Sequence, residues 1–188
     1  WKRDDLTEAA FDEDGFYCIG DAARFEDQNN PKRGIIFDGR VSENFKLSSG
    51  TWVFVGGLRT EVVSASPNII QDAVITGHDR EALGLLIFPN VAGCRMLCRN
   101  LKEEVSLAEL IQMGNVQDPL KAAIKNYNMD NPASSTRISR ALMMEEPPSI
   151  DAGEITDKGY LNQRAVLARR ADLIDKLYSE DQSVIIFE

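Results

Sequence analysis

The apolar segments IIQDAVITG at residues 69–77 and ALGLLIFPN at residues 82–90 decide the fold class of this 188-residue chain. Both are rich in aliphatic residues, and the polar loop His78–Glu81 separates them. Such runs, joined by a short polar loop, predict two neighbouring antiparallel strands that are buried on at least one face. The segment RISRALMMEE at residues 137–146 predicts a further strand, which Pro147-Pro148 stops because proline cannot donate to a sheet ladder.

Helical patterns surround these strands, at residues 57–65, from Ser106 to about Met113, from Asp118-Pro119 onward, and at residues 160–179. Ser106 and Glu109 have the spacing of a capping box, and proline is favoured in the first turn of a helix. On the last helix, the Arg169-Arg170 pair is expected on a solvated face, balanced by nearby acidic residues. Strands and helices in this order predict a small α+β domain with a short antiparallel or mixed sheet and flanking helices.

Three segments precede the predicted sheet: GFYCIGDAARF at residues 15–25, GIIFDGR at residues 34–40 and FKLSSGTWV at residues 45–53. The first two predict strands at Phe16–Ile19 and at residues 34–38, and the third predicts a hairpin. We expect a boundary at residues 40–43, with the last strands of a preceding domain before it. The start at Trp1 instead of Met also suggests a piece of a longer protein.

The composition argues against several classes of function. A formal net charge of -9 and an isoelectric point near 4.7 disfavour a nucleic-acid surface, which needs clustered Lys and Arg. No apolar run approaches the roughly 20 residues that span a bilayer, so we expect no membrane association, and a cytoplasmic location is the default. Cys94 and Cys98 are better explained as buried thiols in a reducing compartment than as a zinc site, because His78 is the only histidine.

Asp21 and Arg40 are the first candidate site residues. A carboxylate can accept hydrogen bonds from both hydroxyls of a ribose; the alternative is a turn aspartate that binds its own backbone. Arg40 is expected at the end of a strand, where its planar group of donors can reach a ligand. The alternative for Arg40 is a surface ion pair, worth about 0–1 kcal/mol.

These segments together resemble the C-terminal part of the adenylate-forming enzymes, the superfamily of acyl-CoA synthetases and luciferases, over nearly the whole chain. Within it, they are most similar to the feruloyl-CoA synthases and related bacterial acyl-CoA synthetases. The resemblance implies that Asp21 and Arg40 hold the ATP ribose. It also implies three parts: residues 1–40 as the end of the large ATP- and acid-binding domain, residues 41–43 as a hinge at Ser42, and residues 44–188 as a mobile domain.

Two lysines are the candidate catalytic residues. Lys46 precedes a Ser/Gly turn that lacks the strand–loop–helix context of a phosphate-binding loop, so a hairpin with a solvated lysine is one interpretation. The resemblance implies instead that Lys46 and Gly50 line a pantetheine channel, and that Lys46 supports thioester formation. Lys158 lies in the glycine-flanked segment GEITDKGYLNQR at residues 153–164, from which it can reach a neighbouring cleft, although most lysines simply lie on the surface.

For Lys158 the resemblance implies the role of adenylation lysine, which stabilises the charge that builds where a carboxylate attacks the α-phosphate. The whole enzyme would then be an AMP-forming acid–CoA ligase that uses ATP, Mg2+ and CoA, with ferulate or another hydroxycinnamate as its acid. The preceding domain would be the chain's own partner and would bind most of these cofactors, so the chain alone is expected to be inactive. Homodimer formation stays open, as do two other functions: a non-catalytic accessory or binding domain, and an adenylating enzyme that passes the acyl group to a carrier protein.

Overall fold

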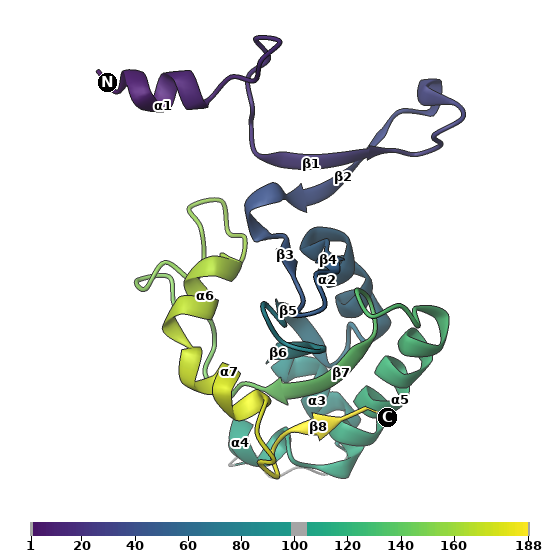
Figure 1. The fold of residues 1–188 in the computed structure, drawn as a ribbon. Helices are drawn as coiled ribbons and strands as arrows, with labels where there is room; N and C mark the ends of the chain where they lie inside the picture. Colours follow the sequence, from purple (N-terminus) through teal and green to yellow (C-terminus); the bar gives the residue numbers. More distant parts are fainter. Residues whose placement is uncertain (1, 99–104, 188) are drawn as a thin grey trace.

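A mixed four-stranded sheet forms the centre of the protein (Figure 1). The computed structural model describes residues 2–98 and 105–187. The strands of this sheet, in spatial order, are β5 (Ile70–Thr76), β6 (Leu83–Pro89), β7 (Ile138–Met143) and β8 (Ile185–Ile186). The pairs β5–β6 and β7–β8 are antiparallel, whereas β6 and β7 are parallel. The predicted antiparallel pair and the predicted α+β class are therefore confirmed.

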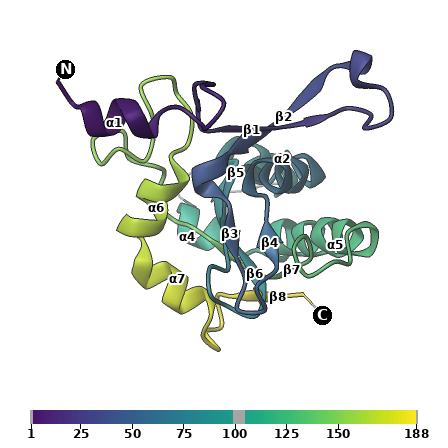
Figure 2. The same cartoon turned by 45° about the horizontal axis from the view of Figure 1, so that its top comes forward.

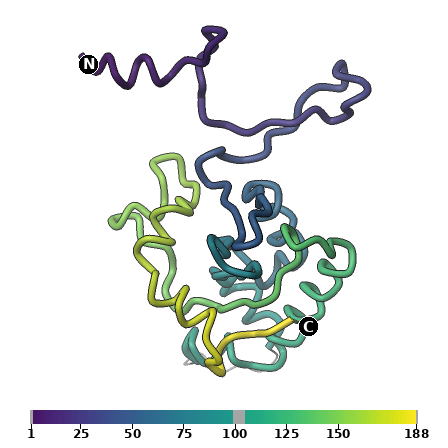
Figure 3. Tube along the Cα trace, viewed as in Figure 1, coloured from purple at the N-terminus to yellow at the C-terminus, as the bar shows by residue number. Residues whose placement is uncertain are grey.

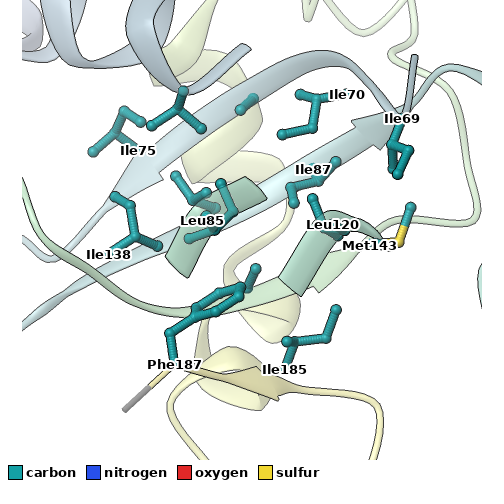
Figure 4. Close-up of a cluster of buried hydrophobic side chains, with 14 of the residues drawn as sticks. Ile69, Ile70, Ile75, Leu85, Ile87, Leu120, Ile138, Met143, Ile185 and Phe187 are labelled. Atoms are coloured by element: carbon teal, nitrogen blue, oxygen red, sulfur yellow. The ribbon is translucent and has the colours of Figure 1, made fainter. Parts of the chain in front are cut away.

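Helices cover both faces of the sheet (Figure 2). One face carries α2 (Val55–Ala65), α3 (Val91–Leu97), α4 (Leu107–Leu110) and α5 (Gly114–Asp130), and the other carries α6 (Gln163–Arg169) and α7 (Ala171–Leu177). Alternate side chains of a pleated strand point to opposite faces, so Ile75, Leu85 and Ile87 enter the larger core and Val74 and Leu86 the smaller one. Figure 4 shows the larger core around these isoleucines and leucines.

The predicted short hairpin is present as β3 (Phe45–Lys46) and β4 (Trp52–Val53), and it packs against the larger core. Phe45, Leu47 and Val53 are buried there. Because side chains alternate along a strand, Lys46 and its cross-strand partner Trp52 lie on the outer face.

The N-terminal part comprises α1 (Asp4–Ala9) and a second hairpin, in which β1 (Asp21–Phe25) pairs with β2 (Ile35–Arg40) around the turn η1 (Pro31–Arg33). It extends away from the central sheet (Figure 3). The predicted strand at Phe16–Ile19 is wrong: Tyr17 makes only an isolated bridge to Phe11, and the strand begins at Asp21. Gly15 and Gly20 have positive φ angles of 83° and 77°, which turn the chain on both sides of that segment.

Two glycines bring the hairpin β1–β2 close to α2. A Cβ atom placed on Gly56 of α2 would lie only 2.4 Å from the Cα of Gly39 in β2. The two backbones are therefore in direct contact, with no room for a side chain between them. The turn η2 (Val41–Glu43) then leads from β2 into β3.

Several predicted helices differ in their bounds. The helix expected from Ser106 to about Met113 is α4, which already ends at Leu110. The helix expected to start at Asp118-Pro119 is α5, which starts at Gly114 and contains Pro119, because Val116 and Gln117 already donate to Met113 O in its first turn. The single helix expected over residues 160–179 is two helices, α6 and α7. Arg170 separates them with φ −108° and ψ 38°, and its side chain is buried, so the predicted solvated face does not include it.

Candidate functional site

Asp21 and Arg40 are cross-strand partners in the hairpin β1–β2. Arg40 Nη1 lies 2.9 Å from Asp21 Oδ1 and donates a hydrogen bond to Ile19 O at 3.2 Å. Asp21 Oδ1 is buried against this guanidinium, although the ion pair does not have the alignment of a hydrogen bond. The structure thus brings the two predicted residues together as an ion pair.

Ser42 lies exposed in η2, the turn that connects this hairpin to the domain. Asn44, two residues after Ser42, fixes this turn to α2. Its N–H closes the turn by donating to Val41 O at 3.2 Å, and its side-chain oxygen accepts from Val55 N of α2 at 3.0 Å. Glu43 lies between Ser42 and Asn44 in the sequence, and burial raises the pKa of its carboxyl. No local pattern in the sequence singles out Asn44, because its partner opens a helix that begins beyond the intervening hairpin.

Lys46 lies above the Trp52 ring, with its Nζ 4.9 Å from the ring centroid. The turn that follows is closed by Gly50 N, which donates to Leu47 O at 2.8 Å, and Gly50 has a positive φ of 83°, which favours glycine. The loop between β5 and β6 braces the hairpin, since Asp79 N donates to Lys46 O at 3.1 Å. Lys46 and Gly50 therefore sit on one well-defined hairpin.

Lys158 lies at the tip of a different hairpin, between β7 and α6. Ile155 and Leu161 form a bridge at its base, and Gly159 N donates to Thr156 O at 2.9 Å across the tip. Lys158 is exposed and forms no ion pair with a residue of 2–98 or 105–187. The segment between β7 and α6 extends toward the side of the domain on which β1 and β2 lie (Figure 1).

Glu154 and Arg170 form a buried ion pair next to the Lys158 hairpin, which the sequence analysis missed. Arg170 Nε and Nη2 donate to Glu154 Oε1 and Oε2, both at 2.8 Å; Glu154 is fully buried and Arg170 is 4% exposed. The interpretation of Arg169-Arg170 as a solvated pair is therefore wrong for Arg170. Arg169 is partly exposed and contacts Glu154 Oε2 at 3.1 Å.

The Glu154 carboxylate is expected to make the fold sensitive to acid. Hydrogen bonds from Arg170 lower the pKa of Glu154 from 4.5 to about 2. Because the folded-state pKa is the lower one, the stabilisation of about 3 kcal/mol is complete above the pKa of the unfolded chain and is lost as the pH falls from about 4.5 toward 2. Thermal unfolding of the wild type and of Glu154→Gln between roughly pH 6 and pH 2.5 checks this, and parallel pH curves would contradict it.

Among the described residues, the other ionisable groups form no second candidate site. Cys94 and Cys98 are buried, and burial raises the pKa of the Cys94 thiol to about 11, so this sulfur stays protonated near neutral pH. Within residues 2–98 and 105–187, no three His, Cys, Asp or Glu side chains are arranged to hold a metal. In the same ranges, no helix has both the length and the apolar character that a membrane crossing needs.

One protein-family model matches residues 54–182 of the chain, and it describes the AMP-binding enzyme C-terminal domain. The curated relatives include a chloroplastic long-chain-fatty-acid–[acyl-carrier-protein] ligase of Arabidopsis thaliana, 25% identical over 186 residues, which cover 95% of this chain and 23% of the relative. Carboxylic acid reductase of Segniliparus rugosus is 25% identical over 181 residues, which cover 96% of this chain and 14% of the relative. The chain thus spans less than a quarter of the length of these two relatives.

Similar solved structures have the same fold. One is the A domain of carboxylic acid reductase from Segniliparus rugosus in complex with AMP and a co-purified carboxylic acid, with a TM-score of 0.70, 21% identity, and coverage of 95% of this chain and 26% of that one. Another is the adenylation domain of the carboxylate reductase from Mycobacterium chelonae, with a TM-score of 0.69, 19% identity, and coverage of 95% and 25%.

Proposed function

Because the chain belongs to the family of AMP-binding enzyme C-terminal domains, we propose that it is the mobile C-terminal part of an AMP-forming acid–CoA ligase. The carboxylate of the acid attacks the α-phosphate of ATP to give acyl-AMP and pyrophosphate, and the CoA thiol then displaces AMP to give the thioester. A hydroxycinnamate such as ferulate is the proposed acid. In this proposal residues 1–40 end the large domain, residues 41–43 are the hinge at Ser42, and residues 44–188 rotate.

The observation that carries the proposal is the placement of Lys46 and Lys158 on two separate hairpins. Both ammonium groups are exposed and have no carboxylate partner in the described parts of the chain, so each can meet a negative charge on a substrate. In the proposed cycle, Lys158 serves adenylation. Rotation about Ser42 then brings Lys46 and Gly50 to the same cleft for thioester formation, as lid movements do in other enzymes.

The nucleotide is the cofactor that residues of this chain fit. Asp21 and Arg40 form an ion pair whose side chains are 31% and 55% exposed, so the pair would hold the ribose of ATP. Mg2+ neutralises phosphate charge in such reactions. Its ligands, the triphosphate site and the acid pocket are assigned to the preceding part of the enzyme.

Release of pyrophosphate tests the proposal. The enzyme that contains this chain would be given ATP, Mg2+ and a panel of aromatic and aliphatic acids, with and without CoA. We expect the fastest release with hydroxycinnamates, and a CoA thioester when CoA is present. No release with any acid would reject adenylation, whereas release without thioester formation would reject only CoA as the acceptor.

A carrier protein is the second candidate acceptor. It is favoured by the curated relatives, one of which is named as an acyl-carrier-protein ligase. A carrier-bound thiol and the CoA thiol require the same displacement of AMP, so Lys46 and Gly50 would serve either acceptor. The same assay with a carrier protein in place of CoA separates the two, because only one of them will accumulate the acyl group.

A further inference from the structure

We propose that Glu154 and Arg170 are positioning residues for Lys158. Their buried ion pair fixes the base of the hairpin that carries Lys158 at its tip. The position from which the exposed ammonium group extends is therefore fixed. This inference rests on the proposed role of Lys158 in adenylation. Neither Glu154 nor Arg170 is exposed enough to meet a substrate directly.

Glu154 joins both legs of the hairpin. It directly precedes Ile155, whose bridge to Leu161 closes the base, and its carbonyl accepts from Asn162 N on the opposite leg at 2.8 Å. Its side chain also accepts from Ser149 N at 2.7 Å, which closes the loop before the hairpin. A shift of Glu154 therefore moves both legs together.

Arg170 connects this base to the sheet. Its Nη1 donates to Glu146 O at 3.0 Å, and its Nη2 donates to Pro147 O at 2.9 Å, just beyond the end of β7. Its guanidinium also lies 5.0 Å from the Phe88 ring centroid on β6. One side chain thus holds the start of the β7–α6 segment and, through Glu154, its hairpin.

Gln163 provides an independent anchor on the far leg. This first residue of α6 is 1% exposed. Its side-chain Oε1 accepts from Ile75 N at 3.2 Å, and its Nε2 donates to Ile75 O at 3.3 Å. The hairpin base is therefore fixed to β5 on one side and to the end of β7 on the other, while the Lys158 tip is exposed.

Net stability alone gives little reason for a charged pair at this place. A buried ion pair is often no more stabilising than apolar residues of the same volume. What a carboxylate and a guanidinium do provide is a fixed relative orientation through two parallel hydrogen bonds. Such orientation is valuable where a cation must meet a developing charge, because misplacement by about 1 Å can cost roughly 10²-fold in rate.

A double-mutant cycle tests the inference in the enzyme that contains this chain. Adenylation is measured as acid-dependent pyrophosphate release, and the second half-reaction as acyl transfer from preformed acyl-AMP. Glu154→Gln should slow adenylation by about 10- to 10²-fold and leave acyl transfer unchanged. In a Lys158→Ala background, Glu154→Gln should cause no further loss, because it acts through that lysine.

The neighbouring arginines provide a matched control. Arg170→Gln should reproduce the loss caused by Glu154→Gln, whereas Arg164→Gln, at an exposed residue of α6, should leave adenylation unchanged. If Arg170→Gln does not fold, Arg170→Lys keeps the charge but not the parallel hydrogen bonds, and it must still slow adenylation selectively.

The possible failures are distinguishable. Equal losses in both half-reactions, or a further loss in the Lys158→Ala background, would overturn the positioning role. A strong Lys158→Ala defect beside an unaffected Glu154→Gln variant would remove this inference and leave the proposed function intact. Normal adenylation by Lys158→Ala would remove the assigned role of that lysine and the positioning role with it.

Discussion

Replacing Lys158 with alanine is expected to slow adenylation by roughly 10²- to 10³-fold, the scale for the loss of one preorganised electrostatic group. The carboxylate attack on the α-phosphate builds negative charge, and an ammonium at that point stabilises the transition state more than the ground state. Lys158 is free to supply this charge, since it is exposed at the tip of its hairpin without an ionic partner in the described residues. Pyrophosphate release and acyl transfer from preformed acyl-AMP, measured separately, check the result.

The selectivity of the loss is the decisive result. Acyl transfer should be largely spared in Lys158→Ala, because the proposed second half-reaction uses Lys46 and Gly50 instead. Lys125→Ala, which removes an exposed lysine from α5, is a suitable control and should leave both half-reactions unchanged. Equal depression of the two half-reactions by Lys158→Ala would disprove its assignment to adenylation.

Replacing Gly56 with alanine is expected to weaken the contact between the N-terminal hairpin and α2. The new Cβ would lie 2.4 Å from Gly39 Cα and 2.9 Å from Asp38 C. These are backbone atoms, which cannot move aside as a flexible side chain does, so the variant should lose about 1–3 kcal/mol of stability. In the whole enzyme, a lid orientation that contains this contact should be disfavoured, and the half-reaction that needs this orientation should slow selectively.

Gly57→Ala is the matched control for this prediction. Its Cβ would meet the Asp38 side chain, with Oδ1 at 2.8 Å, and that side chain can turn away. Alanine is favoured over glycine within a helix by roughly 0.5–1 kcal/mol, so Gly57→Ala should be neutral or stabilising. Denaturant unfolding of both variants decides the matter, and equal effects of the two substitutions would refute the close backbone contact.

The elements that the sequence predicts well are those with strong local patterns. The two apolar runs around His78 give β5 and β6, and Ser106 with Glu109 gives the capping box of α4. The family resemblance predicts Asp21 and Arg40 as a pair, and the register of β1 with β2 places them opposite each other. In these cases the interacting groups lie within one element or in a simple hairpin.

The features that the sequence does not reveal depend on distant partners. Arg170 looks like one of two adjacent solvated arginines, because its contacts to Glu146, Pro147 and Glu154 lie in a preceding segment without regular structure. The same contacts explain the break between α6 and α7, which no glycine or proline marks. The sequence also does not predict the role of Gln163, because its partner Ile75 belongs to β5, a strand that precedes the β6–β7 crossover.

The Gln163 amide has one more consequence, for association between molecules. β5 is an outer strand of the sheet, and outer strands offer unpaired N–H and C=O groups as a template for strand addition and aggregation. At Ile75 the glutamine side chain occupies both groups, much as a neighbouring strand would. At the opposite border β8 is only two residues long. A strand from another molecule would therefore find Ile75 already bonded at one border and only a short strand at the other.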